Sequence, residues 1–223
     1  IIDGRAQKYY TTDEADVFDK PETYEIEIEV DNKRIGPGTQ FNNYNIILKS
    51  LRSVIKIVLG GLQGTNFPIS YPEQRLVLES YMKMLHTDNY NPKKPVYSSD
   101  FVGPSSVTLQ LENVSPINDN SIVPNVRKDF VVTDKADGDR HLLYVNENGK
   151  IYLINSNMKV IFTGAKTNNE ETFNSLIDGE LISHDKDGKF INLYAAFDIY
   201  YLGGVDIRSY TFMISSEEPS MEK

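Results

Sequence analysis

The chain has 223 residues, 39% hydrophobic and 25% charged, a composition typical of a globular protein with enough material for a core. Its net charge of −9 gives no electrostatic signal for a nucleic-acid binder. The absence of cysteine excludes disulfides and cysteine-ligated zinc, and fits a reducing compartment. No run of ~18 apolar residues is present, so no membrane partner is expected.

An acidic N-terminal region contains a strict alternation of polar and apolar residues over 24–30, which predicts a β-strand. A period of two places Glu25, Glu27 and Glu29 on one face of this strand. One interpretation is an amphipathic strand with a solvated acidic face. The other is a carboxylate row inside a barrel or cleft, where mutual repulsion would require a divalent cation such as Mg²⁺ or Mn²⁺.

Two helices are predicted next. Apolar residues recur at three- and four-residue steps over 44–59, which predicts a helix with a core-facing stripe that ends at Gly60 and Gly61. Ser70 and Glu73 have the spacing of a capping box for a second helix that runs to about His86. We interpret residues 40–95 as a helical connector between two units.

From residue 97 onward the composition favours strands. The predicted strands are Phe101–Pro104, Val107–Leu111, Phe130–Val132, Leu142–Val145, Ile151–Ile154, Lys159–Thr163, Leu176–Ile182 and Phe190–Leu202. The segment 146–149, Asn-Glu-Asn-Gly, predicts a hairpin turn, and residues 185–188 predict another turn. This half of the chain is expected to be a largely antiparallel sheet.

Lys135 lies in a polar turn between two apolar runs, two residues before Asp137. A lysine amine is a poor nucleophile while it is protonated, but desolvation or a nearby cation can lower its pKa. We therefore expect Lys135 to be a covalent nucleophile. The three histidines, His86, His141 and His184, lie far apart in sequence and are expected to be exposed rather than to bind a metal.

Three segments in the second half of the chain carry a family resemblance. Residues 135–140, Lys-Ala-Asp-Gly-Asp-Arg, resemble the KxDGxR nucleophile motif of covalent nucleotidyltransferases, which include mRNA capping guanylyltransferases and polynucleotide ligases. Residues 178–180, Asp-Gly-Glu, resemble the DGE motif of that superfamily. Residues 195–199, with Phe197 and Asp198, resemble the apolar strand motif that follows it. All three occur in family order.

The predicted glutamate strand indicates which group of this superfamily the chain resembles. A Glu-x-Glu-x-Glu strand before a guanylyltransferase resembles the capping enzymes of large DNA viruses, in which a metal-dependent, tunnel-type RNA triphosphatase precedes the guanylyltransferase. This resemblance implies an α+β fold. It divides the chain into the end of a β-barrel-type triphosphatase (1–39), the helical connector (40–95) and the first part of a nucleotidyltransferase domain (96–223).

The resemblance also implies site residues and substrates. Lys135 would attack GTP and carry GMP to the 5′-diphosphate end of an RNA, after the triphosphatase has acted on its 5′-triphosphate. The nucleotide-binding residues implied are Asp137, Gly138, Arg140, Asp178, Gly179, Glu180, Phe197 and Asp198, and the metal ligands are Glu25, Glu27 and Glu29. Arg140 would reach ribose or phosphate, Glu180 and Asp198 would hold ribose hydroxyls or Mg²⁺, and Phe197 would stack on the purine.

Some motifs of these families are missing from the chain. A second Glu-x-Glu strand is absent, and so are a Lys-x-Lys motif and a C-terminal OB domain. We therefore expect an internal fragment that forms the GMP adduct poorly by itself. A downstream methyltransferase in the same polypeptide and a cytoplasmic location, in the host cytoplasm or a viral factory, are further expectations.

Two other functions stay open. The first is an ATP-dependent DNA or RNA ligase, which uses the same lysine chemistry with another base. The second is a non-catalytic nucleotidyltransferase-like domain that serves as a binding module.

Overall fold

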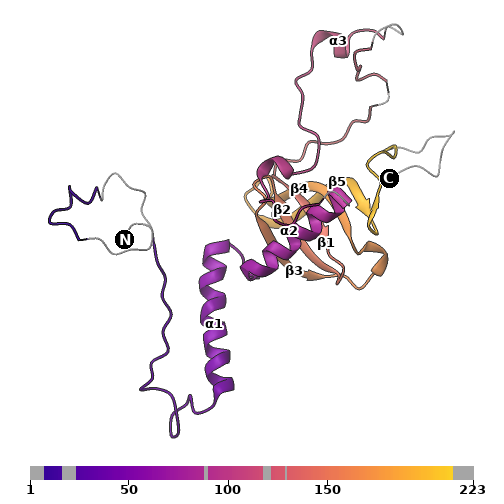
Figure 1. Cartoon of the computed structure of the whole chain (residues 1–223). Helices are drawn as coiled ribbons and strands as arrows, with labels where there is room; N and C mark the ends of the chain where they lie inside the picture. Colours follow the sequence, from indigo (N-terminus) through magenta and orange to yellow (C-terminus); the bar gives the residue numbers. More distant parts are fainter. Residues whose placement is uncertain (1–7, 17–23, 88–89, 118–121, 129, 213–223) are drawn as a thin grey trace. The chain divides into compact units, whose positions relative to one another are not determined.

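The computed structural model describes residues 8–16, 24–87, 90–117, 122–128 and 130–212 (Figure 1). The chain divides into two compact units, Ile1–Arg52 and Ser53–Lys223. Each unit is described by itself below.

In the first unit, residues 24–30 are irregular and exposed, so the strand predicted for the alternating glutamates is not formed (Figure 1). A strand needs a hydrogen-bonded neighbour, and the described residues offer none to this segment. The first unit also contains a bridge between Ile35 and Phe41. The part of a triphosphatase barrel predicted for residues 1–39 therefore stays a prediction.

Helix α1, Tyr44–Gln63, begins where it was predicted but continues through Gly60 and Gly61. The residue that follows the helix, Gly64, has a φ of +68°, which an L-amino acid rarely adopts. Of the predicted core stripe, Tyr44, Leu48, Val54 and Ile55 are exposed and the other residues are only partly buried, so in the described chain the stripe is not a core face.

The turn after α1 is held by Gln63, the one buried residue of this helix. Its side-chain amide donates to the Ile69 carbonyl at 2.7 Å, and its Oε1 accepts the Ile69 N–H at 3.1 Å. Helix α2, Tyr71–His86, then forms where it was predicted. The Ser70 hydroxyl accepts the Glu73 N–H at 3.2 Å, which confirms Ser70 as the N-cap.

The second unit contains an antiparallel six-stranded sheet in the order β3-β2-β1-β4-β5-β6. The strands are β1 Asp139–Val145, β2 Lys150–Asn155, β3 Val160–Lys166, β4 Ser175–His184, β5 Phe190–Leu202 and β6 Val205–Asp206. The predicted hairpin turn at 146–149 is confirmed, since the Gly149 N–H donates to the Asn146 carbonyl at 3.0 Å. The predicted α+β class with a largely antiparallel sheet is therefore confirmed.

One face of this sheet forms the core with α2. In β1 and β2, Leu142 faces Ile154 and Tyr144 faces Tyr152, and all four side chains are buried. Val77, Tyr81 and Met82 of α2 belong to the same core cluster. Because α2 shares this core, it is part of the sheet's own fold, although the predicted boundaries 40–95 and 96–223 stay predictions.

Three predicted strands before the sheet are absent from the described chain. Phe101–Pro104 and Val107–Gln110 are irregular, and the end of the second run instead begins the short helix α3, Leu111–Val114. Phe130–Val132 is irregular too, with Val132 fully exposed. β-branched residues favour a pleated, half-buried surface, and these segments pair with no strand of the described chain.

Short 3₁₀ helices at Ser98–Asp100 (η2) and Glu170–Thr172 (η3) complete the described elements. No helix among the described residues has the length and apolarity needed to cross a membrane.

Candidate active site

Lys135 lies in the irregular segment that leads into β1, and 83% of its side chain is exposed. Its ammonium group forms an ion pair with Asp137 and donates to the Ala136 carbonyl at 3.4 Å. The hydrogen bond and charge of Asp137 raise the pKa of Lys135, and the same bond lowers the pKa of Asp137. In this structure the amine is solvated and paired with an anion, so its pKa is raised rather than lowered, and the role of Lys135 as nucleophile stays a prediction.

Glu180 joins the lysine segment to β4. Its Oε2 accepts the Gly138 N–H at 2.9 Å, and Arg140 and Glu180 are register partners in the β1–β4 pair. Gly138 cannot carry a side chain here, because a Cβ would lie 2.6 Å from the Leu181 carbonyl oxygen. The sheet thus brings together Lys135, Gly138 and Glu180, which the sequence had singled out as far-apart motif residues.

These groups line a shallow hollow of about 420 Å³. It is lined by Lys135, Asp137 and Glu180, and also by Ser183 and His184 of β4. It is the place in the described chain where the predicted nucleophile faces open space with carboxylates beside it. Sequence reasoning did not assign Ser183 or His184 to the site, since neither belongs to a recognised motif.

The guanidinium of Arg140 is hydrogen-bonded to other residues of the chain. Its Nε lies 3.0 Å from Asp178 Oδ1 and its Nη2 lies 2.6 Å from Asp178 Oδ2, while Nη1 donates to the Pro104 carbonyl at 2.8 Å. The hydrogen bond to Asp178 raises the pKa of Arg140. In this arrangement the guanidinium holds Asp178 rather than reaching a ribose or phosphate, so the role predicted for Arg140 is not supported here.

Asp178 is fully buried and its charge is matched by three donors. The third is the Tyr200 hydroxyl, which donates to Oδ2 at 2.5 Å, and burial strongly raises the pKa of Tyr200. Sequence reasoning missed Tyr200. It lies in β5 two residues after Asp198, next to a register shift in the β4–β5 pair, so strand alternation in the sequence offers no signal for it.

The chain before the lysine is held against the same arginine. The Arg140 guanidinium lies over the Phe101 ring, 5.5 Å from its centroid. Gly103 has a φ of +134°, and a Cβ there would lie 2.2 Å from Arg140 Nη2. Only glycine allows this close approach, so the segment 101–104 is anchored to Arg140 without being a strand.

Gly179 has a packing role. A Cβ on it would meet the Ala195 carbonyl at 2.5 Å and the Tyr194 ring at 2.6 Å. The Tyr194 hydroxyl lies 2.8 Å from the His141 carbonyl and 2.9 Å from the Ile177 carbonyl. The glycine of the Asp-Gly-Glu segment therefore lets Tyr194 cross the sheet. His141 was expected to be exposed, but it is buried in β1.

Phe197 and Asp198 lie in β5 at a register shift opposite Asp178 and Gly179. Asp198 is the register partner of Asp178, and its Oδ1 accepts the Ile199 N–H at 2.8 Å. Phe197 is 39% exposed. Neither residue lines the hollow at Lys135, so their predicted roles at the purine and ribose stay predictions.

The described chain contains no group of three histidine, aspartate or glutamate residues placed to hold a metal ion. Glu25, Glu27 and Glu29 are exposed on an irregular segment, and their role as metal ligands stays a prediction. Carboxylates at the hollow still suit a magnesium ion, which commonly takes one or two protein carboxylates together with substrate phosphates.

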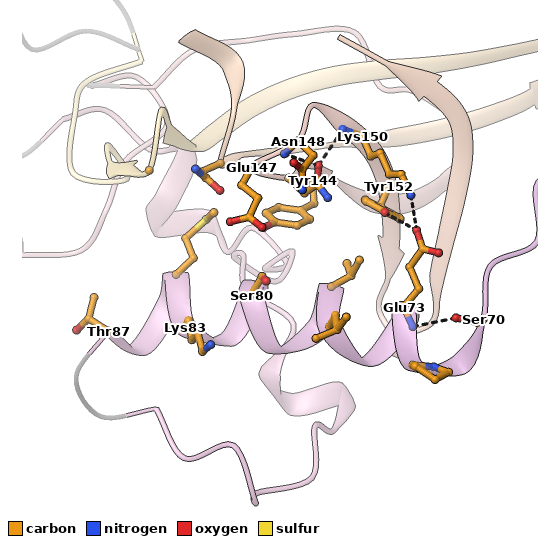
Figure 2. Close-up of a pocket in the computed structure, with 17 residues that line it drawn as sticks. Ser70, Glu73, Ser80, Lys83, Thr87, Tyr144, Glu147, Asn148, Lys150 and Tyr152 are labelled. Carbon is orange, nitrogen blue, oxygen red and sulfur yellow. Dashed lines mark hydrogen bonds and ion pairs between the residues drawn. The ribbon is translucent and has the colours of Figure 1, made fainter. Parts of the chain in front are cut away.

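A second, larger hollow of about 910 Å³ lies between α2 and the β1–β2 hairpin (Figure 2). Glu73, predicted to complete the capping box, instead accepts from Lys150 Nζ at 2.8 Å and from the Tyr152 hydroxyl at 2.9 Å. Burial raises the pKa of Glu73, but the two hydrogen bonds together outweigh it and the net pKa is lowered. On the opposite wall, burial raises the pKa of Tyr144 to about 12.

None of the 17 residues drawn around the larger hollow was predicted to bind nucleotide (Figure 2). Its polar groups join α2 to the sheet, since Glu73 comes from the helix and both of its side-chain donors from β2. We therefore assign this cluster to packing and place the candidate active site at Lys135.

Comparison with known proteins identifies the family. Residues 65–215 match the family model described as the catalytic domain of mRNA capping enzymes. The chain is also 30% identical, over 191 residues, to a "Probable mRNA-capping enzyme" of Acanthamoeba polyphaga mimivirus. That alignment covers 84% of this chain and 13% of the viral protein, so the chain spans about an eighth of the relative's length.

The matched range contains α2, the whole sheet and all three motif segments, and it includes Lys135 and the hollow beside it. The resemblance read from the motifs is confirmed, and the chain belongs to the family of mRNA capping enzyme catalytic domains.

Proposed function

We propose that this chain supplies the nucleophile-bearing part of a GTP:RNA guanylyltransferase that caps mRNA through a covalent lysyl-GMP intermediate. The observation that carries the proposal is the arrangement at the hollow, where Lys135 is exposed beside Asp137 and the Gly138–Glu180 hydrogen bond holds its segment. Membership in the capping-enzyme family supports guanine as the base of the nucleotide.

In the first step, Lys135 Nζ attacks the α-phosphorus of GTP. A nitrogen–phosphorus bond forms, the bond from the α-phosphorus to the oxygen that bridges the α- and β-phosphates breaks, pyrophosphate leaves, and the nitrogen releases one proton to solvent. The amine must lose a proton first, and the pair with Asp137 opposes this because it stabilises the ammonium form. In the second step, an oxygen of the RNA 5′-diphosphate attacks the same phosphorus, the nitrogen–phosphorus bond breaks, and the lysine regains its proton.

Asp137 and Glu180 are the carboxylates we assign to magnesium or manganese at this hollow, together with oxygens of the nucleotide. A bound divalent cation would offset the negative charge of the triphosphate. Arg140, Asp178 and Tyr200 hold β1, β4 and β5 in register behind the lysine segment. We propose that they position the site and do not contact the substrate.

The test is adduct formation. The full-length protein incubated with labelled GTP and a divalent cation should acquire a label that survives denaturation, and Lys135→Ala should abolish it. Lys128→Ala, a change at another exposed lysine, should leave the label intact. Labelling from ATP alone would replace this proposal with the ligase alternative, and full capping activity in Lys135→Ala would support a non-catalytic module.

An RNA triphosphatase formed with Glu25, Glu27 and Glu29, a methyltransferase in the same polypeptide and a cytoplasmic location are part of the same proposal. The family resemblance supports them. We also propose that the 223-residue chain alone forms the adduct poorly, and a robust adduct from this chain would contradict that statement.

A further inference from the structure

The tip of the β4–β5 hairpin, residues 183–191, begins with two residues that line the hollow at Lys135. Ser183 and His184 line this hollow together with the nucleophile. The hairpin is shaped by Asp185, whose Oδ1 accepts the N–H groups of Asp187 and Lys189 at 2.9 Å each. Its position is therefore set by its own hydrogen bonds.

The tip carries an exposed aromatic pair. His184 and Phe190 are register partners, with ring centroids 5.5 Å apart and planes at 67°. His184 is exposed, and Phe190 is 66% exposed. Because His184 lines the hollow and its ring packs against that of Phe190, a ligand that enters the hollow meets an exposed aromatic pair.

The chemistry of the proposed reaction says what arrives at this edge. After the first step GMP is bonded to Lys135, and the RNA 5′-diphosphate must reach that phosphorus through the same open space. The first nucleotides of the RNA therefore pass the rim of the hollow. Unpaired RNA bases are recognised largely by stacking on aromatic side chains.

The charges of the tip favour stacking over ionic attraction as the main contact. Lys186 and Lys189 are exposed, but Asp185 and Asp187 of the same turn balance them. Asp137 and Glu180, which line the same hollow, are acidic as well. RNA is a polyanion, so an acidic rim does not attract it by charge. Stacking of RNA bases on aromatic rings does not depend on that charge and is the contact that remains available.

We propose that His184 and Phe190 form a stacking platform for the 5′-terminal bases of the acceptor RNA, and so act in GMP transfer but not in adduct formation. This inference rests on the proposed guanylyltransferase function. It assigns a role to a hairpin that lies between the second and third motif segments and belongs to neither.

The experiment compares both half-reactions in the full-length protein carrying Phe190→Leu, which keeps an apolar side chain but removes the ring. The yield of labelled GMP adduct should stay within about twofold of wild type. The KM for a 5′-diphosphate RNA oligonucleotide should rise roughly tenfold, within the range that base stacking supports. His184→Ala should act in the same direction, and Phe190→Tyr should restore transfer.

Tyr71→Ala is the matched control, because Tyr71 is 64% exposed but lies on α2 outside the hollow. It should alter neither half-reaction. Binding of the same RNA, followed by fluorescence anisotropy, supplies a readout that does not depend on catalysis, and Phe190→Leu should weaken it by a similar factor.

The outcomes separate this inference from the function on which it rests. If wild type forms no GMP adduct, the proposed function fails, and the anisotropy measurement still decides whether the hairpin binds RNA. If Phe190→Leu matches wild type in RNA binding and transfer, the platform is refuted. Equal losses in adduct formation and in GMP transfer would mean that the pair binds the guanine or supports the fold. That result would overturn the inference as well.

Discussion

Arg140 and Asp178 form a two-point ion pair across β1 and β4, with nitrogen–oxygen distances of 3.0 and 2.6 Å. The carboxylate is completely buried, and the arginine side chain is 30% exposed. Residues of two motif segments, 38 positions apart in the chain, are thereby joined beneath the lysine segment. The ion pair therefore holds β1 and β4 together next to the candidate site.

Removing the carboxylate should destabilise the fold. Asp178→Ala leaves the Arg140 charge partly buried without its anion, and we expect the unfolding free energy to fall by about 3 kcal/mol. Tyr200→Phe, which removes one donor to the same oxygen, should cost about 1 kcal/mol. Urea denaturation followed by circular dichroism measures both. Asp206→Ala is the control, because Asp206 and Arg208 form a similar pair that is 45% and 40% exposed and should be worth under about 1 kcal/mol.

The link between α2 and the sheet should depend on pH. Glu73 has a lowered pKa in the folded chain, because the hydrogen bonds from Lys150 and Tyr152 outweigh the effect of burial. A lowered folded-state pKa contributes stability above the unfolded value of 4.5, and this contribution is lost as the pH falls through the folded-state pKa.

Glu73→Gln should therefore destabilise the chain by about 1 kcal/mol at pH 7, and the difference from wild type should shrink as the pH falls below 4.5. Urea midpoints measured from pH 7 to pH 3 test this. A difference that stays constant over that range would mean that Glu73 acts through packing alone.

Asp137 should control the protonation of the nucleophile. Its carboxylate raises the pKa of Lys135, so Asp137→Asn should lower that pKa and increase the fraction of free amine at a given alkaline pH. The test is acylation of Lys135 by an amine reagent without nucleotide, followed by mass spectrometry as a function of pH. The profile should shift to lower pH in the variant, while the profile of Lys128 stays in place. An unshifted Lys135 profile would show that the ion pair does not persist in solution.

Gly138 should be intolerant of any side chain. A Cβ there would lie 2.6 Å from the Leu181 carbonyl and would push the lysine segment away from Glu180. We expect Gly138→Ala to reduce GMP adduct formation in the full-length protein at least tenfold, by analogy with the cost of ~1 Å misplacement of catalytic groups. Gly61→Ala is the matched control, because a Cβ at Gly61 meets nothing within 4 Å. Equal activity of the two variants would contradict this role.

The elements that could be predicted from the sequence are those whose interactions are local. Strand β5 was predicted at Phe190–Leu202, the hairpin turn at 146–149 and the start of α2 at its Ser70 cap, and the structure confirms all three. Alternation, turn residues and caps act within a few residues of the chain, so they can be read directly.

The predictions that were wrong depend on a distant partner. The glutamate segment 24–30 and the run Phe130–Val132 have strand-like patterns but find no neighbour in the described chain. Within the part of the chain that the structure describes, half of the predicted apolar stripe of α1 is likewise exposed. Periodicity reports which face of an element is apolar, and it carries no information about whether another element will cover that face.

For the candidate site, the sequence determined which residues resemble the family motifs. Lys135, Gly138, Arg140, Asp178 and Glu180 were predicted from that resemblance, and the family match spans all of them. Only the tertiary structure decided which of these residues contact one another. The β1–β4 register turns Arg140 toward Asp178 and brings Glu180 to Gly138, and the β4–β5 hairpin places His184 beside the lysine. Hydrogen bonds between the strands set these contacts. The spacing of residues along one strand does not reveal which residues of a neighbouring strand will lie opposite them.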